Sequence, residues 1–319
     1  MISASSITLE YISAARARIA PHVRHTPTEF SPALSQRFNH EIFLKHENWQ
    51  KTGSFKVRGA LNMLLTLSEE DKRHGVITAS AGNHGLGVAY ACQLLGIAGK
   101  IVVPLKASPA KVKALQSFNL ELIQQGKDYD EAEAIAWEIQ KKKGLTFVHG
   151  FSDPAIVAGQ GTIALEIFEA LPNAGTIVVP IGGGGLISGV AIAAKSINPK
   201  IKIIGVQSEA SPAMHASLRA GRPLETPIHD TIADGLSGRF VTEYNLGLVQ
   251  QWVDDVLLVS EPAINEAMKL ILETERILIE GSAAVGLAAF LESKITASGK
   301  TVLILTGRNI DTRVLKSIV

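Results

Sequence analysis

Cysteine is almost absent from this sequence, which contains only Cys92. A single cysteine excludes a framework of disulfides within the chain. Because Cys92 lies in an apolar stretch with helical spacing, we expect it to be a small buried core residue, and a reactive thiol is disfavoured. An excess of charge is absent too, because 31 Lys and Arg face 30 Asp and Glu and no long block of one sign occurs. This balance argues against nucleic acid or a membrane surface as the main partner.

Long apolar runs and targeting signals are also missing. Residues 1–6 contain no basic region followed by an apolar run, so they do not resemble a secretory signal. No uninterrupted apolar segment reaches the roughly 18 residues needed to span a bilayer. We therefore expect a cytoplasmic protein. Its 319 residues, 46% of them hydrophobic, are enough for two domains with buried cores.

The most distinctive stretch is Lys51–Gly59, in which Lys56 stands between Phe55 and Val57 with a glycine three residues to either side. Residues 57–67 have helical spacing, which predicts that Lys56 lies near a helix N-terminus, where the dipole disfavours a positive charge. Burial disfavours the ammonium form as well. A neutral lysine amine can form a Schiff base with a carbonyl cofactor. For a lysine taken alone, an ordinary surface role is the commoner interpretation, so the hypothesis depends on the stretches described next.

Four consecutive glycines, 182–185, follow a predicted strand and precede a predicted helix that begins at Leu186. Such a junction leaves several N–H groups unpaired, and the absence of side chains lets an anion approach them. A tight turn packed against the sheet is the alternative, but four glycines are more than a turn needs. The spacing fails the G-x-G-x-x-G pattern of dinucleotide sites at its last glycine. The sequence therefore predicts a phosphate site here.

Polar side chains occupy further positions at the ends of predicted elements. Ser80, Asn83 and His84 lie in a loop between a strand and a helix, where open parallel sheets bind ligands. Their donors suit a carboxylate, although His84 alone would be an ordinary loop histidine. Thr306 ends the last strand, where its hydroxyl could bond a ring nitrogen without protonating it; an ordinary strand-end threonine is the alternative. Glu280 precedes a helix of small residues and is interpreted as its N-cap, with a role in the site left open.

Short apolar strands alternate with helices along most of the chain, which predicts an α/β fold with parallel sheets and right-handed crossovers. The segment Pro212–Asn245 is rich in loop residues and is left unassigned. The predicted strands are 41–46, 76–79, 100–104, 120–124, 176–180, 202–206, 253–259 and 301–305. The predicted helices are 9–20, 57–67, one ending at 95, 110–118, 130–143, 159–171, 186–197, 261–275 and 282–291.

Together these stretches resemble the fold type II pyridoxal-phosphate enzymes, most closely the threonine/serine dehydratase and serine racemase branch. The shared motifs are Lys-Thr-Gly-Ser-Phe-Lys at 51–56, Ser-Ala-Gly-Asn-His-Gly at 80–85, Ala-Gly-Gln-Gly-Thr at 158–162 and Gly-Gly-Gly-Gly-Leu at 182–186. The resemblance covers nearly the whole chain and implies two parallel-sheet αβα domains with the active site between them. Residues 1–74 and 151–319 would form a large cofactor-binding domain, and residues 75–150 a small inserted domain.

The resemblance also implies a role for each candidate residue. Lys56 would carry pyridoxal 5′-phosphate and act in catalysis, with Phe55 beside the ring. Asn83 would bond the 3-hydroxyl of the ring, and Thr306 its nitrogen. The phosphate would be held by Gly182, Gly183, Gly184, Gly185 and Leu186. The carboxylate of an amino-acid substrate would be bound by Ser80, Ala81, Asn83 and His84. No metal site is expected.

The implied activity is that of a dehydratase (ammonia-lyase) which converts a β-hydroxy L-amino acid such as threonine or serine to a 2-oxo acid and ammonia. A racemase of the same branch is disfavoured, because the serine that serves it as a second proton-transfer base is Ala81 here. The metal-binding acidic positions of the racemases correspond to Gln207 and Ala213, and an asparagine near their cofactor corresponds to Phe151. Two alternatives remain: a dehydratase of a hydroxyectoine-type breakdown pathway, which residues 213–218 resemble, and a non-catalytic amino-acid-binding protein. We expect copies of the chain to form a homo-oligomer.

Overall fold

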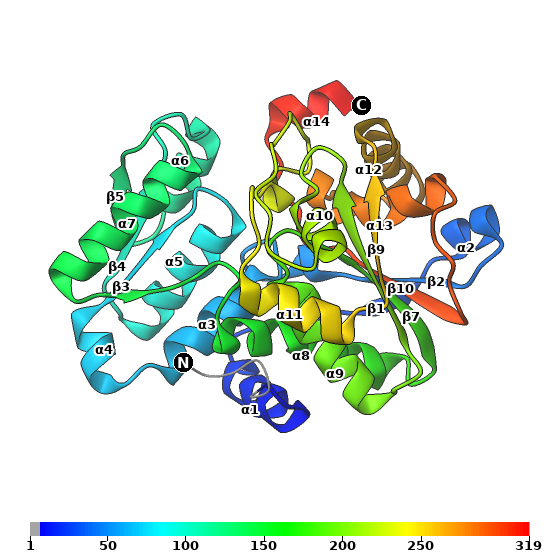
Figure 1. Ribbon diagram of the computed structural model, residues 1–319, viewed down its shortest axis with the longest axis horizontal. Helices are drawn as coiled ribbons and strands as arrows, with labels where there is room; N and C mark the ends of the chain where they lie inside the picture. Colours follow the sequence, from blue (N-terminus) through cyan, green and yellow to red (C-terminus); the bar gives the residue numbers. More distant parts are fainter. Residues whose placement is uncertain (1–6, 319) are drawn as a thin grey trace.

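The computed structural model describes residues 7–318, which form two β-sheets flanked by helices (Figure 1). The smaller sheet consists of β3 (Val76–Ala79), β4 (Gly99–Val103), β5 (Glu121–Gln124) and β6 (Thr146–Phe147). The larger sheet consists of β1 (Thr28–Phe30), β2 (Ile42–Lys45), β7 (Ala174–Pro180), β8 (Lys202–Ser208), β9 (Asp255–Val259) and β10 (Lys300–Ile304). The strand orders are β5-β4-β3-β6 and β1-β2-β10-β7-β8-β9.

The prediction of an α/β fold with parallel sheets is confirmed, although the two short strands β1 and β6 were not predicted. All neighbouring strands pair in parallel except β1 and β2, which pair antiparallel at the edge of the larger sheet. The sequence analysis missed β1 because it has only three residues and a mostly exposed pattern, too short to establish an alternation of apolar and polar positions.

Helices cover both faces of the smaller sheet. On one face, α7 (Tyr129–Lys143) packs through its buried alanines. On the other, α5 (Asn83–Leu95) and α6 (Pro109–Gln116) pack together against β4. Cys92 is buried within α5, as predicted, and burial raises the pKa of its thiol to about 12.

The larger sheet is covered in the same way, because successive side chains of a strand point to opposite faces. Ile177 and Val179 of β7 belong to one core, and Val178 between them belongs to the other. The first core is closed by α1 (Leu9–Ile19), α8 (Pro154–Ala170) and α9 (Gly185–Ile197). The second is closed by α2 (Pro32–Phe38), α12 (Glu261–Glu275) and α13 (Gly281–Leu291). The remaining helices are α3 (Lys56–Thr66), α4 (Glu69–His74), α10 (Ala213–Ala220), α11 (Glu243–Trp252) and α14 (Thr312–Ile318).

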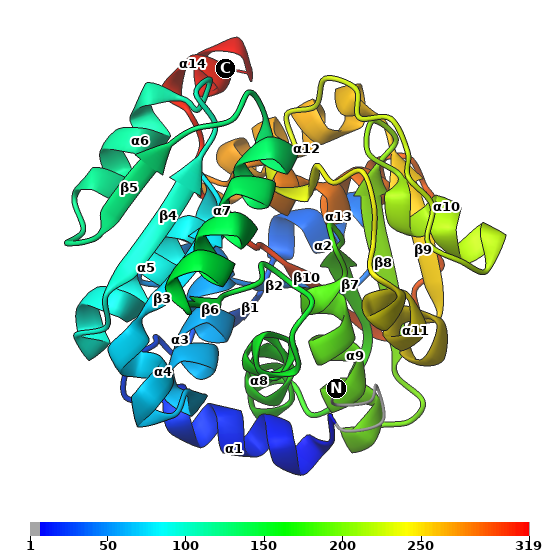
Figure 2. The same cartoon turned by 60° about the vertical axis from the view of Figure 1, so that its left-hand side comes forward.

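Helix α3 lies between the two units and packs against α5 of the smaller and α8 of the larger (Figure 2). Glycines permit this approach. A Cβ at Gly159 would stand 2.6 Å from the Cα of Gly59, and a Cβ at Gly189 would stand 2.2 Å from the carbonyl oxygen of Val157. The motif Ala158–Thr162 is therefore where α3, α8 and α9 come into backbone contact, which fixes the direction of α3 and of the lysine at its start.

Several helices differ from the prediction, and α2, α4, α10, α11 and α14 were not predicted. The helix predicted from Gly159 begins at Pro154, after the N-cap Asp153, whose Oδ1 accepts from the N–H of Ala155 at 2.7 Å. An aspartate before a proline is a helix-start signal that the prediction overlooked. The unassigned segment Pro212–Asn245 contains α10 and the first residues of α11, separated by irregular backbone with a short 3-10 turn at Asp234–Leu236.

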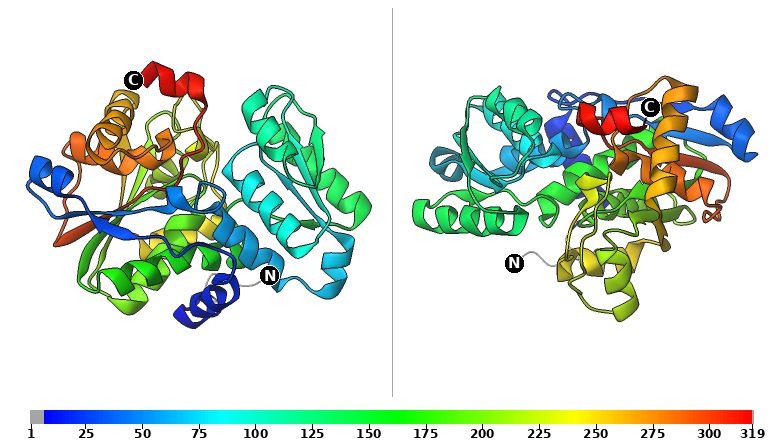
Figure 3. Two further views of the ribbon diagram at one scale, coloured as in Figure 1. Left: turned by 180° about the vertical axis from the view of Figure 1, so that it is seen from behind. Right: turned by 90° about the horizontal axis from the view of Figure 1, so that it is seen from above.

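The chain leaves the larger sheet after β2 and returns to it at β7. The stretch of chain between these two strands supplies all strands of the smaller sheet, which forms a separate unit (Figure 3). These strands fall within residues 75–150, the predicted inserted domain; where the two domains divide stays a prediction. Among the helices of residues 7–318, none is both long enough and apolar enough to cross a membrane.

Candidate active site

Lys56 is the first residue of α3, as predicted, and it lies at the boundary between the two units. The loop before it is tied to the end of β10, because the N–H of Phe55 donates to the carbonyl of Thr306 at 3.1 Å. Gly53 turns this loop with a φ of +76°, a conformation that favours glycine. The Lys56 amine donates to the carbonyl of Gly150 at 2.8 Å. The lysine is thus held from its backbone by the larger unit and from its tip by the segment that follows β6.

The Lys56 amine is easily deprotonated. Burial lowers the pKa of Lys56 from 10.5 to about 8, and the negative charge of Glu280 opposes this shift. About a tenth of the amine is therefore neutral near pH 7, whereas an unperturbed lysine would be almost fully charged. The expectation that its surroundings disfavour the ammonium form is supported.

This pKa predicts how fast the protein captures a carbonyl cofactor. Because only the neutral amine attacks a carbonyl, the association rate of pyridoxal phosphate with unloaded protein should rise about tenfold per pH unit below pH 8 and level off above it. Stopped-flow absorbance between about pH 6 and about pH 10 measures the rate. A rate that still climbs steeply beyond pH 9 would mean that the pKa of Lys56 is unperturbed.

The amine faces a cavity of about 750 Å³ between the two units. Its walls come from both units. The loop after β3 and the first residues of α7 lie on one side, and the glycine loop, residues 234–240, Thr306 and residues 309–311 lie on the other. The cavity thus opens at the carboxyl ends of strands β3, β7 and β10, the edge at which open parallel sheets bind ligands. The sequence-predicted site residues Phe55, Ser80, Ala81, Asn83, His84, Gly182–Leu186 and Thr306 all line it.

The glycine loop offers unpaired donors to this cavity. Strand β7 ends at Pro180, and α9 begins at Gly185 without a side-chain cap. Among residues 7–318, no backbone or side-chain acceptor meets the N–H groups of Gly183, Gly184 or Gly185. Free N–H groups at the positive end of a helix form an anion site. The geometry therefore suits a phosphate, as the sequence predicts.

The glycines are also required by packing. A Cβ at Gly183 would stand 2.4 Å from the ring of Phe151, and one at Gly184 would stand 2.7 Å from Cε of Met214 at a φ of +93°. The sequence favoured the approach of an anion as the reason for the absent side chains, with a packed turn as the alternative, and both reasons apply to this loop. Bulky substitutions here would disturb the fold as well as the anion site.

We therefore expect Gly183→Ala to displace Phe151 and to lower the free energy of unfolding by about 1–3 kcal/mol. The same substitution should weaken the binding of the cofactor phosphate. Gly247→Ala is the matched control, because a Cβ at Gly247 in α11 meets nothing within 4 Å. That control should gain about 0.5–1 kcal/mol from helix propensity. Thermal unfolding of the two variants, with and without cofactor, measures both their stability and the stabilisation that cofactor binding adds. A Gly183→Ala protein as stable as the wild type would contradict the packing described here.

A buried hydroxyl without a partner marks the opposite wall. Thr306 follows β10, is 2% exposed, and its Oγ1 has no hydrogen-bond partner within the described residues. A buried hydroxyl left unpaired is costly, so a ligand that hydrogen-bonds to Thr306 would relieve this cost. A neutral hydroxyl at Thr306, free N–H groups at the glycine loop and a reactive amine at Lys56 face one cavity, and this donor set fits pyridoxal phosphate.

The loop after β3 meets the expectations only in part. Asn83 begins α5, and Ser80 Oγ accepts from the N–H of Gly82 at 3.2 Å. The ring of His84 is buried, with Nε2 3.0 Å from the carbonyl of Val148. Burial and the nearby Lys56 lower its pKa to about 3. The neutral ring donates its one N–H to the carbonyl of Val148. A substrate carboxylate would therefore meet the backbone N–H groups at the start of α5. The contact of His84 with substrate stays a prediction.

Glu280 was interpreted as an N-cap, and it does occupy that position before α13, but its side chain makes no capping bond. Its carboxylate instead enters the cavity wall and accepts from Asn83 Nδ2 at 2.7 Å and from the N–H of Asn309 at 3.1 Å. Burial and the charge of Asp234 raise the pKa of Glu280 to about 7, while its bonds and Lys111 oppose the rise. In the sequence, Glu280 was noted only as an acid ahead of a helix of small residues, and no role was predicted for Asn309.

Polar contacts also join the two units around the cavity mouth. Lys111 of α6 pairs with Asp234, and Arg239 Nε lies 2.9 Å from Asp130 of α7. These residues belong to segments for which the sequence gave no assignment or no functional signal. They were missed because they meet only in the folded chain.

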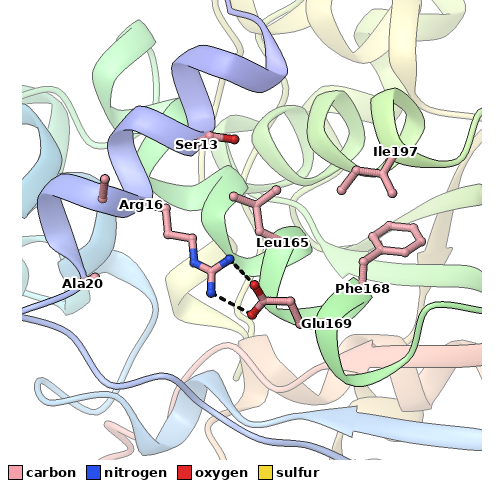
Figure 4. Close-up of a pocket in the computed structure, with 8 residues that line it drawn as sticks. Ser13, Arg16, Ala20, Leu165, Phe168, Glu169 and Ile197 are labelled. Carbon is pink, nitrogen blue, oxygen red and sulfur yellow. Dashed lines mark hydrogen bonds and ion pairs between the residues drawn. The ribbon is translucent and has the colours of Figure 1, made fainter.

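A second hollow lies between α1 and α8, lined by Leu165, Phe168 and Ile197 (Figure 4). Its two charged residues bond each other, with Arg16 Nη2 2.7 Å from Glu169 Oε2. With its charges paired, this hollow directs no free charged group at a ligand and does not compete with the cavity at Lys56.

Comparison with known proteins places the chain among relatives of one kind. Residues 19–307 match the family described as "Pyridoxal-phosphate dependent enzyme". The chain is 45% identical over 314 residues to the L-threonine ammonia-lyase of Thermotoga maritima, and this match covers 98% of the chain and 78% of that protein. It is 41% identical over 308 residues to the catabolic L-threonine dehydratase TdcB of Escherichia coli, with coverage of 96% and 94%.

Solved structures agree with these relatives. Maize serine racemase superposes with a TM-score of 0.93 at 37% identity, covering 98% of this chain and 96% of the racemase. Threonine deaminase isoform 2 of Solanum lycopersicum superposes with a TM-score of 0.92, also at 37% identity, covering 97% of this chain and 86% of the deaminase.

Proposed function

We propose that this chain, which belongs to the pyridoxal-phosphate dependent enzyme family, converts a β-hydroxy L-amino acid to a 2-oxo acid and ammonia, with threonine and serine as the substrates to test first. One observation carries the proposal: the Lys56 amine, with its pKa lowered to about 8, faces the same cavity as the unpaired donors of the glycine loop and Thr306. The similarity to L-threonine ammonia-lyases supports the choice of substrate.

The chain's own residues suggest how the cofactor would be held. The N–H groups of Gly182–Leu186 would bind its phosphate, Thr306 would donate to its ring nitrogen, and Asn83 would contact its 3-oxygen. Pyridoxal phosphate bound in this way supplies an acceptor for the electron pair that remains when the α-proton of an amino acid leaves.

Lys56 would be the base for that proton, because the amine of the substrate would replace it on the cofactor and leave the Lys56 amine free. With a pKa of about 8, about half of its amine is neutral near that pH. Its position in the cavity lining holds the amine where it can take a proton from Cα. The substrate carboxylate would be oriented by the N–H groups at the start of α5. Loss of the α-proton and of the β-hydroxyl, which departs as water, leaves an unsaturated amine that hydrolyses to the 2-oxo acid and ammonia.

Racemisation is the second candidate function, because serine racemase is among the structures that superpose on this chain. The residues that would support it differ here. Ala81, which is half-buried in the cavity wall, has no exchangeable proton. Gln207, at a position that is acidic in the racemases, uses its Oε1 to accept from the N–H of His215 at 2.9 Å. We therefore favour elimination.

Purified protein loaded with cofactor should be incubated with L-threonine, L-serine and their D-isomers, with 2-oxo acid and ammonia measured together. The proposal expects equal amounts of both products from at least one L-substrate. Conversion between L- and D-isomers without 2-oxo acid would establish the racemase. Absence of product together with retained amino-acid binding would establish a binding protein.

The cytoplasmic location and the homo-oligomer stay predictions that accompany this proposal. Light scattering of the loaded protein measures the number of copies directly, and a mass of 34.0 kDa would correspond to the single chain.

A further inference from the structure

We propose that Glu280 is a positioning residue which, together with Asn309, fixes the side-chain amide of Asn83 so that Asn83 presents an N–H, and not its carbonyl oxygen, to the cavity. The inference deepens the proposed function, because it takes from that proposal the identity of the group that Asn83 meets: the 3-oxygen of the pyridoxal ring. The hydrogen bonds that join Glu280, Asn309 and Asn83 are observed in this chain and do not depend on that proposal.

The orientation of each amide in this network follows from a backbone group that cannot be reversed. The carbonyl of Thr52 can only accept, and Asn309 Nδ2 lies 2.8 Å from it. The second proton of the same Nδ2 points to Asn83 Oδ1, at 2.7 Å. Asn83 must therefore turn its Nδ2 the other way, toward Glu280 Oε1 at 2.7 Å. An amide flip at Asn83 would set donor against donor at one end and acceptor against acceptor at the other.

Glu280 in its ionised form completes the network because it accepts at both oxygens. Oε1 takes the Asn83 bond, and Oε2 takes the backbone N–H of Asn309 at 3.1 Å. The backbone of Glu280 is held in turn, since its N–H donates to the carbonyl of Gly307 at 3.0 Å. One carboxylate thus ties the start of α13 to the segment after β10 and to the start of α5.

Two glycines leave the space that this network occupies. A Cβ at Gly307 would stand 2.4 Å from Glu280 Oε1, and a Cβ at Gly53 would stand 2.5 Å from Asn309 Oδ1. Neither glycine belongs to the predicted phosphate loop. Their absent side chains accommodate the amides and carboxylate that surround Asn83.

The consequence is a defined donor in the cavity wall. One proton of Asn83 Nδ2 is used by Glu280, and the other is left for a ligand. An N–H at this position stabilises an ionised oxygen opposite it more than a protonated one. The charged groups that face Glu280 are Asp234, Lys111 and Lys56, and none of them contacts Asn83 through a hydrogen bond among the described residues.

Glu280→Gln is the sharp test, because glutamine has nearly the same shape but only one acceptor. Whichever way its amide turns, an N–H faces either Asn83 Nδ2 or the N–H of Asn309. We expect the dissociation constant of pyridoxal phosphate to rise about tenfold, the effect of losing one well-placed hydrogen bond to a charged group. The pH midpoint of the visible absorption of the bound cofactor should move upward by about one unit, because the ionised 3-oxygen loses its donor.

Glu292→Gln is the matched control at the other end of α13. Glu292 Oε1 accepts from the N–H of Ser260 at 3.3 Å and from its hydroxyl at 2.6 Å, far from the cavity. This variant should lose thermal stability without changing either the dissociation constant or the absorption midpoint. Asn309→Ala is measured alongside, because it removes the bond to Asn83 Oδ1 and leaves Glu280 in place; it should shift both quantities in the same direction.

If Glu280→Gln does not fold, the dissociation constant and the absorption midpoint of Asn309→Ala test the proposal in its place. The proposal is overturned if the variants that fold bind the cofactor with wild-type affinity and an unchanged absorption midpoint, since Glu280 would then serve stability alone. Failure of the wild-type protein to bind pyridoxal phosphate at Lys56 is a different result, which would overturn the proposed function and not the geometry of the network.

Discussion

Lys56→Ala protein is expected to retain a weakened affinity for pyridoxal phosphate and to lose at least about 10²–10⁴-fold in turnover, the usual effect of removing a positioned proton-transfer group. Cofactor binding should survive where turnover does not, because the groups that would hold the cofactor come from several elements and only one of them is removed. The N–H groups of Gly183–Gly185 and the hydroxyl of Thr306 remain in the variant, whereas the amine that takes the α-proton is removed.

Lys51→Ala is the matched control for this experiment. Lys51 is exposed and its amine lies 5.9 Å from the ring centre of Tyr90. It belongs to the loop that precedes Lys56 but not to the cavity lining. Its replacement should leave turnover within about twofold of the wild type, as expected for surface substitutions of less than about 0.5 kcal/mol. Turnover by Lys56→Ala within tenfold of the wild type would show that another residue is the base.

Ala81→Ser is expected to raise the ratio of D-isomer formed to 2-oxo acid formed by about tenfold or more. Racemisation needs a proton delivered to the face of the carbanion opposite Lys56, and in racemases of the resembling branch a serine at this position supplies it. Ala81 lies half-buried in the loop between β3 and α5 and lines the cavity, so a hydroxyl there would reach the site. A positioned acid contributes about 10²–10⁴-fold to such a step, which is why even imperfect placement should be measurable.

Chiral chromatography beside a 2-oxo acid assay measures the ratio directly. Ala81→Val controls for added volume, because valine enlarges the side chain without an exchangeable proton and should form no additional D-isomer. Racemisation that already rivals elimination in the unmodified protein would overturn the assignment as a dehydratase.

Local sequence patterns were enough to place the residues whose role depends on their own neighbours. Lys56 falls at a helix start and the glycines fall at a strand–helix junction because both positions follow from periodicity and glycine content within about ten residues. The alternation of strands and helices similarly predicted parallel sheets. Such signals are local, so they do not require knowledge of which segments meet.

Residues whose role depends on distant partners could not be predicted in the same way. Glu280 looked like a helix cap because its neighbours in sequence suggest one, while its actual partners are 197 and 29 residues away in the chain. His84 looked like a free donor, but its ring N–H donates to the carbonyl of Val148, the residue that follows β6. Arg239 and Asp130 lie on different units and meet only across the cavity mouth. Contacts of this kind follow from tertiary packing, which overrides local propensity.

The central claim is that Lys56 is the residue to which the cofactor is attached. Reduction of the loaded protein with borohydride, followed by proteolysis and mass spectrometry, would record the attachment site permanently. The account predicts one major modified peptide, with the pyridoxyl group on Lys56 and no comparable label on Lys51 or Lys45. A label on another lysine, or none on protein that carries the cofactor, would contradict it.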